Sequence, residues 1–291
     1  VTGFIRDANR ATISKTRIVA GGRTTVSQQI VRVDKESKEP MGKAQEQQLM
    51  AYLAKVLPQV KGVVLSDYGS GTITDKLLEQ IFAYCHGHNI PTIVDSRYDI
   101  LRFKTVDYIK QNDAELSAAI GRDLTTEEEL VQGGCELLVK MAAKGALITR
   151  GEDGMSLFQI VSPQEAADYL KAQETGDSEE AGQFGEGLAV KLVVKRQTGC
   201  LSVVQMLIRY QERDILVSHI PVTDKSEVYD VSGAGDTCVA AVILGLAAGV
   251  EPLLASQLSN EASGIAVRKM GTAVVYAQEL KERFRQLGYE A

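Results

Sequence analysis

The sequence predicts an α/β protein in which a parallel sheet is covered by helices on both faces. First, short apolar runs typical of strands alternate with amphipathic helical patterns between residues 44 and 149. Second, such alternation is typical of βαβ units, whose crossover helices cover both faces of the sheet. Third, 44% of the residues are apolar, only 5% are aromatic and Trp is absent, so we expect a core of aliphatic side chains.

The first 35 residues have the pattern of a small separate sheet. Ile18-Val19 and residues 28–34 are short β-branched segments separated by Gly21-Gly22. Charged side chains on one face of the second segment predict an exposed hairpin that covers another part of the protein.

The central region supplies the elements of the main sheet. Thr74 is a plausible N-cap, and Thr125 with Glu128 has the spacing of a capping box. We expect helices over 44–57, 74–85, 114–120 and from 125 onward, and strands over 62–66, 91–95, 107–110 and 145–149, with 155–158 as a hairpin partner of the last strand.

Residues 164–187 interrupt this alternation. They carry seven acidic residues, one Lys and four Gly, which predicts a solvated loop or insertion. Beyond it we expect strands over 189–195 and 213–220 and helices over 235–246, 252–270 and 277–287, while 197–212 has no clear pattern.

Composition excludes several classes of function. The net charge of −6 argues against a general nucleic-acid binder, and no apolar run of 18 residues is present, so we expect no membrane-spanning helix. The spacings of Cys85, Cys135, Cys200 and Cys238 suggest reduced thiols and no zinc site. The three histidines include an isolated His219 and an H-x-H pair that lacks a third ligand. These features favour a cytoplasmic protein.

Polar residues follow each predicted parallel strand. They occupy positions 66–69, 95–97, 112 and 149–151. Because ligands of open α/β sheets bind at the carboxyl ends of the strands, these positions are candidate site residues.

The strongest chemical signal is the sequence Y-D-V-S-G-A-G-D-T over residues 229–237. Its glycines permit a close approach of the backbone to a ligand, and the helix that follows offers free amides and a positive dipole end to an anion. Asp236 at this helix start could take a proton from an attacking hydroxyl group. Four residues are a weak motif, however, and a tight turn with Asp236 as a favourable first-turn acid remains the alternative. No P-loop and no G-x-G-x-x-G after a strand occur; the latter disfavours a dehydrogenase, which would have to bind NAD.

In this context the chain resembles the ribokinase-like (phosphofructokinase B type) carbohydrate kinases, and more closely the bacterial heptose-7-phosphate kinases, including the kinase half of the bifunctional heptose kinase/adenylyltransferase. The resemblance covers about residues 10–160 and 225–280. It rests on the strings KTRIVAGG, QQIVRVDKE, LSDYGSG, IVDSRY, KQNDAELSAAIG, LITRGEDGMSLF, YDVSGAGDT and SNEASGIAVRKMGT, which occur in the family's order.

The resemblance implies a role for each matching position. Asp236 would be the catalytic base, and Gly233, Ala234 and Gly235 would form the anion hole. Asn112 and Glu115 match the N-x-x-E motif associated with Mg²⁺, which they would hold through water. The nucleotide would also contact Thr149, Gly151, Gly154, Asp230, Ser232, Asn260 and Gly271, and the substrate Arg17, Arg32, Asp34 and Asp67. Residues 15–34 resemble lid strands that often pair between subunits, which predicts a homodimer.

Structural alternatives stay open for these positions. Asn112 and Glu115 could form a helix cap, residues 149–151 an ordinary hairpin turn, and Asn260 a polar position on an exposed helix face. Asp67 and Asp95 could be strand-end caps, and the charges of the lid could simply be solvated: Arg17, Arg32 and Asp34.

The chain also departs from the family pattern. Ser232 replaces the usual Thr, and Ser96-Arg97 replaces the Pro-Lys of the heptose kinases, so the contacts there are in doubt. A family segment ahead of the lid, with a Gly-Gly sugar-binding motif and an early strand, has no counterpart, and the chain begins with Val1. We therefore expect an N-terminally incomplete kinase.

The resulting hypothesis is a three-layer α/β/α ribokinase-like core with a mostly parallel sheet and a small β lid. The lid and N-terminal remnant would occupy 1–36, and the core 37–291 with an acidic insertion near 162–212. The resemblance implies ATP-dependent phosphorylation of a sugar or sugar-phosphate hydroxyl, with heptose 7-phosphate as the favoured acceptor and ATP and Mg²⁺ as cofactors. The alternative is a truncated or degenerate kinase that only binds nucleotide or dimerises.

Overall fold

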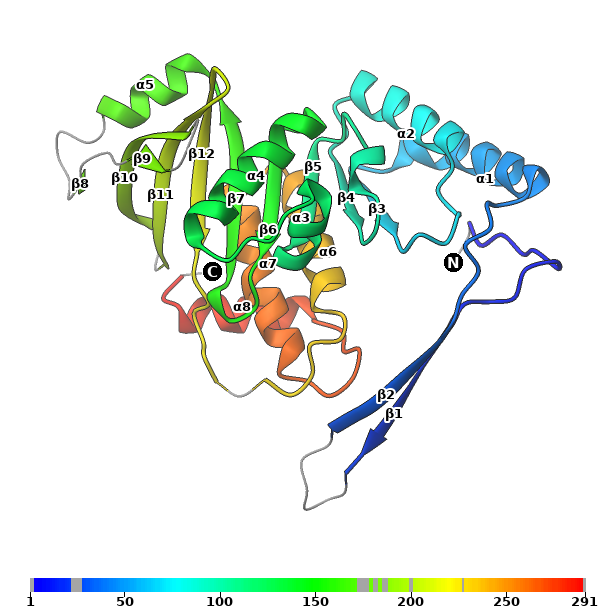
Figure 1. Cartoon of the computed structure of the whole chain (residues 1–291). Coiled ribbons are helices and arrows are strands. Elements are labelled where there is room, and N and C mark those ends of the chain that lie inside the picture. The colour runs from blue at the N-terminus through cyan, green and yellow to red at the C-terminus, as the bar shows by residue number, and fades with distance from the viewer. Residues whose placement is uncertain are drawn as a thin grey trace.

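The structure is a computed structural model that describes residues 3–21, 28–171, 178–179, 183–184, 188–198, 201–226 and 228–289. In these residues a ten-stranded sheet lies between two layers of helices, and a separate two-stranded hairpin projects from one side (Figure 1). The three-layer α/β prediction is confirmed. No helix of the described residues has the length and apolarity needed to cross a bilayer.

The sheet has a parallel and an antiparallel half. The parallel half consists, in spatial order, of β3 (Val63–Asp67), β4 (Thr92–Ser96), β5 (Tyr108–Asn112) and β6 (Gly145–Thr149). The antiparallel half continues with β7 (Met155–Val161), β12 (Arg213–Ile220), β11 (Leu201–Tyr210) and β10 (Leu188–Thr198), and β10 also pairs with β8 (Ser178–Glu179) and β9 (Gln183–Phe184).

Each face of the sheet has its own apolar core. On one face, side chains such as Ile93 and Leu147 pack against Val239 and Val242 of α6 (Ala234–Ala247), which in turn packs on α7 (Pro252–Val267). The other face packs against α1 (Lys43–Val56), α2 (Asp75–Gly87), α3 (Asp113–Ile120) and α4 (Glu127–Met141). Helix α8 (Ala277–Gln286) lies against α7, and single-turn helices occupy Leu57–Gln59, Ile100–Arg102 and Gly151–Asp153.

The helix starts follow the capping signals of the sequence with one shift. Thr74 caps α2 as predicted, because its side chain accepts a hydrogen bond from the amide of Leu77. The capping box of α4 consists of Thr126 and Glu129, one residue later than predicted. Thr126 has the extended N-cap backbone, and Thr125 adds its amide and its hydroxyl group as further donors to the same Glu129 carboxylate.

The acidic segment is more ordered than the predicted solvated loop. Residues Pro163–Lys171 form α5, whose Ala166 is buried against Leu207 of β11. Residues 197–212, which showed no sequence pattern, contribute the end of β10 and all of β11. Antiparallel pairing satisfies the backbone of these strands, so they need no continuous apolar run. The rest of the predicted loop (172–177, 180–182 and 185–187) lies outside the described residues.

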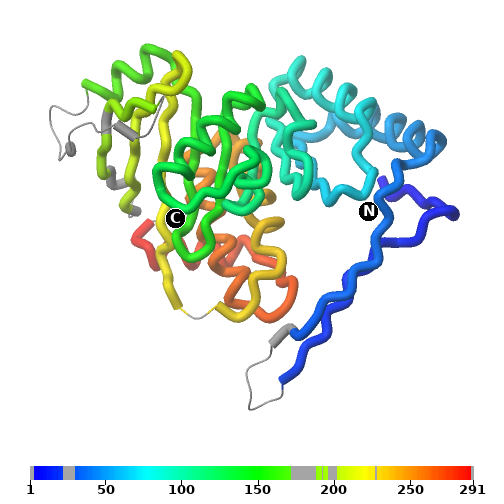
Figure 2. The backbone as a smooth tube through the Cα atoms, in the orientation of Figure 1, coloured from blue at the N-terminus to red at the C-terminus, as the bar shows by residue number. Residues whose placement is uncertain are grey.

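The hairpin forms its own sheet from β1 (Ser14–Ala20) and β2 (Gln28–Lys35). Arg17 lies opposite Arg32 in its antiparallel register. The hairpin extends away from the helical layers as an arm (Figure 2).

Candidate active site

The four parallel strands bring the predicted polar residues to one edge of the sheet. Asp67, Asp95 and Asn112, at the ends of β3, β4 and β5, line one pocket. Thr149, at the end of β6, lines a neighbouring cavity. The polar residues that follow the four parallel strands thus line two neighbouring cavities at this edge.

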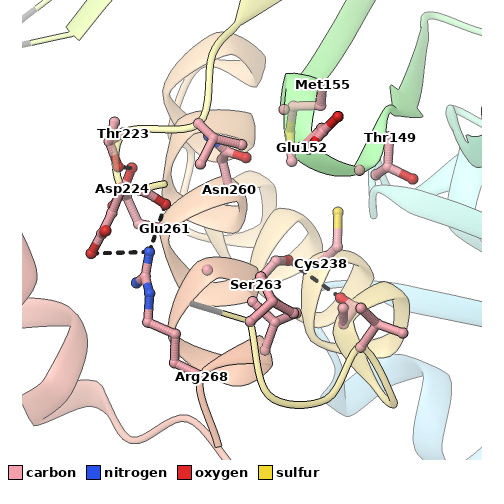
Figure 3. A pocket seen from close by; sticks show the side chains of 18 of the residues that line it. Thr149, Glu152, Met155, Thr223, Asp224, Cys238, Asn260, Glu261, Ser263 and Arg268 are labelled. Atoms are coloured by element: carbon pink, nitrogen blue, oxygen red, sulfur yellow. Dashed lines mark hydrogen bonds and ion pairs between the residues drawn. The ribbon is translucent and has the colours of Figure 1, made fainter. Parts of the chain in front are cut away.

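The neighbouring cavity has a volume of about 460 Å³ and lies between the β6–β7 turn and helices α6 and α7 (Figure 3). Thr149, Gly151, Gly154 and Asn260 all line it. Gly154 has φ +86°, and a Cβ there would lie 2.1 Å from the carbonyl oxygen of Ile220, so only glycine fits.

Asn260 is buried, which rules out the alternative of an exposed polar position. Its side-chain amide donates a hydrogen bond of 2.8 Å to the carbonyl of Pro221, where the chain leaves β12. The labelled side chain projects from α7 toward the cavity (Figure 3). Asn260 thus ties α7 to the segment that borders the cavity.

His219 is isolated in the sequence but not in the fold. Its Nε2 lies 3.0 Å from Glu127 and its Nδ1 2.7 Å from the hydroxyl of Ser156. Glu127 also accepts from the guanidinium of Arg150, in the turn that borders the cavity. This hydrogen-bonding network anchors the β6–β7 turn to the start of α4.

The second pocket has a volume of about 890 Å³ and lies beside the first. The residues Gly235, Val228 and Val231 line both, so the two cavities meet at the start of α6. The predicted site residues along the second pocket are Arg17, Arg32, Asp67, Asn112, Glu115, Asp230, Ser232, Gly233, Gly235 and Asp236.

The start of α6 has the geometry expected of an anion site. Gly233 is the N-cap with φ +83°, and Asp236 is the acidic residue of the first turn. The amides of such a first turn have no intrahelical acceptors and face the positive end of the helix dipole. A Cβ on Gly235 would lie 2.9 Å from Nζ of Lys110, so the glycine lets an ammonium group approach the helix start.

Lys110 and Asp95 form a buried ion pair beneath this turn. The two groups lie 3.1 Å apart, and their side chains are 6% and 15% exposed. Burial opposes the charge of Lys110, but Asp95, Cys238 and Glu115 together outweigh this effect and raise the pKa of the lysine above its ordinary value. The ammonium group of Lys110, paired with the Asp95 carboxylate, therefore lies beside Gly235, where the two cavities meet.

Asp230 links the glycine-rich turn to the loop before α8. Its two oxygens accept hydrogen bonds from the amides of Ser232 at 2.8 Å and Gly271 at 3.1 Å. The Ser232 amide is the main cause of the lowered pKa of Asp230, which therefore stays ionised. Asp230 and Gly271, both predicted site residues, thus act together in holding the turn.

Asn112 and Glu115 form a reciprocal capping box at the start of α3. Asn112 accepts from the Glu115 amide at 2.7 Å, and Glu115 accepts from the Asn112 amide at 2.9 Å. The helix-cap interpretation is confirmed, and both side chains also border the second pocket. No cluster of three or more His, Cys, Asp or Glu side chains that could hold a metal occurs among the described residues.

The predicted substrate residues have partners within the protein. The Nε of Arg32 donates to Asp34 at 2.9 Å on the exposed hairpin. Asp67 accepts from the Gly69 amide and from the Ser96 hydroxyl. Arg17 borders the second pocket, as does Asp67, whereas Asp34 is not among its lining residues. Their roles toward a substrate stay predictions.

Sequence reasoning missed Lys110 of this pocket, and it identified Tyr68 and Arg97 only as polar positions after predicted strands, without a role. Lys110 had a detectable signal, since a lysine within a short strand of a two-faced sheet must be buried and needs a partner. Tyr68 donates a hydrogen bond of 3.1 Å to Asp236, which lies 168 residues later in the chain, and no local sequence pattern predicts such a contact.

The fold and this site define the class of protein. Residues 5–182 and 208–278 match the pfkB family of carbohydrate kinases, and the chain belongs to that family. Among curated proteins it is 33% identical to the bifunctional protein HldE of Hyphomonas neptunium, 32% to that of Geobacter metallireducens and 30% to that of Desulfatibacillum aliphaticivorans. The alignments cover 94%, 96% and 99% of this chain but 44%, 45% and 48% of the relatives, so the chain spans a little under half their length.

Solved structures share the fold at low sequence identity. Phosphofructokinase-2 from Escherichia coli, in complex with potassium, matches with a TM-score of 0.58 and 16% identity over 91% of this chain and 68% of its own. Ribokinase from Arabidopsis thaliana, in complex with ribose and ATP, matches with a TM-score of 0.54 and 16% identity over 95% and 70%. The ribokinase-like fold class is therefore confirmed.

Proposed function

We propose that this chain transfers the γ-phosphoryl group of ATP to a hydroxyl group of a sugar or sugar phosphate. The observation that carries the proposal is the meeting of two cavities at Gly235, with Asp236 in the same turn. A nucleotide in the first cavity would direct its terminal phosphate to this turn, and an acceptor in the second would approach from the other side.

The residues at this point supply what phosphoryl transfer requires, which is chiefly positioning and charge stabilisation. The first-turn amides and Lys110 stabilise negative charge on the phosphoryl group, and Asp236 accepts the proton of the attacking hydroxyl group. The oxygen of the acceptor forms a bond to phosphorus as the bond to the ADP oxygen breaks.

We propose heptose 7-phosphate as the acceptor. The resemblance to heptose-7-phosphate kinases and the 30–33% identity to HldE proteins support this choice. Arg17, Arg32 and Arg97 border the second pocket and would suit an acceptor that carries its own phosphate.

Magnesium would be held at the rim by Asn112 and Glu115. Their capping bonds leave acceptor capacity on both side chains, and Mg²⁺ commonly keeps several waters and few protein ligands. This donor set fits an ion bound through water and the nucleotide phosphates, which would neutralise phosphate charge.

The test is calorimetry with ATP and Mg²⁺, followed by ADP release with a panel of sugars that includes heptose 7-phosphate, fructose 6-phosphate and ribose. We expect ATP binding and ADP release that depends on the acceptor, with heptose 7-phosphate preferred. Reactions without acceptor control for ATP hydrolysis. Binding without turnover would favour the degenerate nucleotide-binding module, and absence of ATP binding would contradict both.

We also propose that the hairpin pairs two copies of the chain. Its exposed apolar side chains support this proposal: Ile18, Val19, Ile30, Val31 and Val33 are 44–62% exposed. Sedimentation should show a dimer, and Ile30→Asp should produce monomers, because a charge would be buried at the interface. A wild-type chain that sediments as a monomer at micromolar concentration would contradict the proposal.

A further inference from the structure

Tyr68 contacts the proposed base from the opposite side of the acceptor pocket. Its hydroxyl group donates to Oδ1 of Asp236 at 3.1 Å. Tyr68 lies just beyond β3, whereas Asp236 lies in α6, so the contact joins the two elements that enclose the pocket. A carboxylate with one oxygen occupied keeps the other, Oδ2, for the hydroxyl group of an acceptor.

The turn that carries Tyr68 is tightly specified. The Asp67 carboxylate accepts from the Gly69 amide at 3.1 Å through one oxygen and from the Ser96 hydroxyl at 2.9 Å through the other. Gly69 has φ +67°, a left-handed conformation that favours glycine. These contacts fix the backbone on both sides of Tyr68 and therefore the point from which its side chain extends into the pocket.

The charges around Tyr68 keep its hydroxyl group a donor. Burial, and then the Asp236 charge, raise the pKa of Tyr68 to about 12, so the phenol stays protonated at any pH at which the enzyme would work. Asp95 acts in the same direction and Arg97 opposes it. The ammonium of Lys15 also faces the ring.

Lys15 connects this contact to the hairpin. Its Nζ lies 4.5 Å from the centroid of the Tyr68 ring, within the range of a cation–π interaction. Lys15 belongs to β1 and is itself held by Glu36, 3.3 Å away, just beyond the end of β2. Lys15 of the hairpin therefore contacts Tyr68, which in turn donates a hydrogen bond to Asp236, the proposed general base.

We infer that Tyr68 is the positioning residue of the proposed base, that it fixes the Asp236 carboxylate with Oδ2 toward the acceptor, and that Lys15 holds the Tyr68 ring from the hairpin. The inference rests on the proposed kinase function. It assigns Tyr68 no contact with the nucleotide, since Tyr68 does not line the nucleotide cavity.

The experiment compares Tyr68→Phe with the wild type in steady-state phosphotransfer, with kcat and the KM values for ATP and the acceptor measured separately. Loss of a hydrogen bond to a charged group typically lowers a rate or equilibrium constant about 10- to 100-fold. We therefore expect kcat to fall by about this factor while the KM for ATP is unchanged. The KM for the acceptor should also stay unchanged, because the inference gives Tyr68 no direct contact with the substrate.

Two further sets of variants separate positioning from general damage. Tyr84→Phe, on α2 and stacked on His88, removes a hydroxyl group far from the pocket and should leave every parameter unchanged. Lys15→Gln should lower kcat about threefold, the size of an exposed cation–π contact, and Lys15→Arg should retain activity because arginine restores that contact.

The outcomes discriminate between the inference and the function on which it rests. If the wild type turns over and kcat is unchanged in Tyr68→Phe, the positioning role is overturned. A rise in the acceptor KM alone would instead make Tyr68 a substrate contact, which also overturns it. Absence of turnover in the wild type with every acceptor would remove the proposed function and the inference together.

Discussion

Replacement of Asp236 by Asn tests the proposed reaction most directly. Asn has the same shape, and its oxygen can still accept the hydrogen bond from Tyr68, so the pocket should keep its geometry. The amide cannot accept the proton of an acceptor hydroxyl group. Because a general base contributes about 10²- to 10⁴-fold, we expect kcat to fall at least ~10²-fold.

The same change should cost little stability. An acid in the first turn of a helix contributes about 0.3–1 kcal/mol, and loss of the charge also relieves repulsion with Asp95, so the free energy of unfolding should fall by less than about 1 kcal/mol. The affinity for ATP should persist, because Asp236 does not line the nucleotide cavity.

Three measurements on one preparation test these expectations: ADP release, calorimetry with ATP, and urea unfolding. Asp75→Asn is the matched control, since it removes an exposed first-turn acid from α2 and should leave kcat unchanged. Near-normal turnover in Asp236→Asn would refute the assignment of the base. Loss of ATP binding together with turnover would show that the variant is misfolded.

Three further predictions concern the supports of the site. Gly154→Ala should lower the free energy of unfolding by at least about 1–2 kcal/mol in urea, since its left-handed backbone admits no Cβ, whereas Gly87→Ala, with open space around it, should cost nothing. The Glu127 pKa is lowered to about 2 by its histidine and arginine partners, so Glu127→Gln should cost about 1 kcal/mol at pH 7 after allowance for solvent screening, a difference that disappears as the pH falls from about 4.5 toward 2. An equal difference at pH 2.5 and pH 7 would contradict this origin. Lys110→Met should destabilise the protein by about 3 kcal/mol by leaving Asp95 buried without a partner, and Asp95→Asn in the same chain should recover part of the loss; additive effects in the double variant would contradict the pairing.

The parallel half of the fold could be predicted because its signals are local. A buried strand in a two-faced sheet is a short apolar run, and 62–66, 91–95 and 145–149 each lie within one residue of the observed strand limits. The antiparallel half could not be predicted in the same way. Residues 201–210 gain their strand structure from pairing with β10 and β12, which the local sequence does not encode.

The candidate site likewise contains residues with a local sequence signal and residues whose role depends on contacts distant in the chain. Gly233 and Asp236 were accessible to sequence reasoning because a glycine-rich turn before an apolar helix is a local pattern with a physical meaning. Asn112 and Glu115 were found, but their capping geometry shows that a motif residue can also be required for the helix that carries it. Both side chains also border the second pocket.

The contacts that the sequence did not predict, such as that between Gly235 and Lys110, depend on packing between elements that are distant in the chain. Helix α6 follows the whole antiparallel half in sequence, yet it packs back against β3 and β4 at the far side of the sheet. This return places Gly235 over the ion pair of Asp95 and Lys110, on adjacent parallel strands. The buried charge pair would be a costly defect in the sheet alone, since two ions must be removed from water. Beneath a helix start that is open to an anion, the Asp95 carboxylate holds the Lys110 ammonium group in a fixed position, which gives the cost of burial a chemical reason.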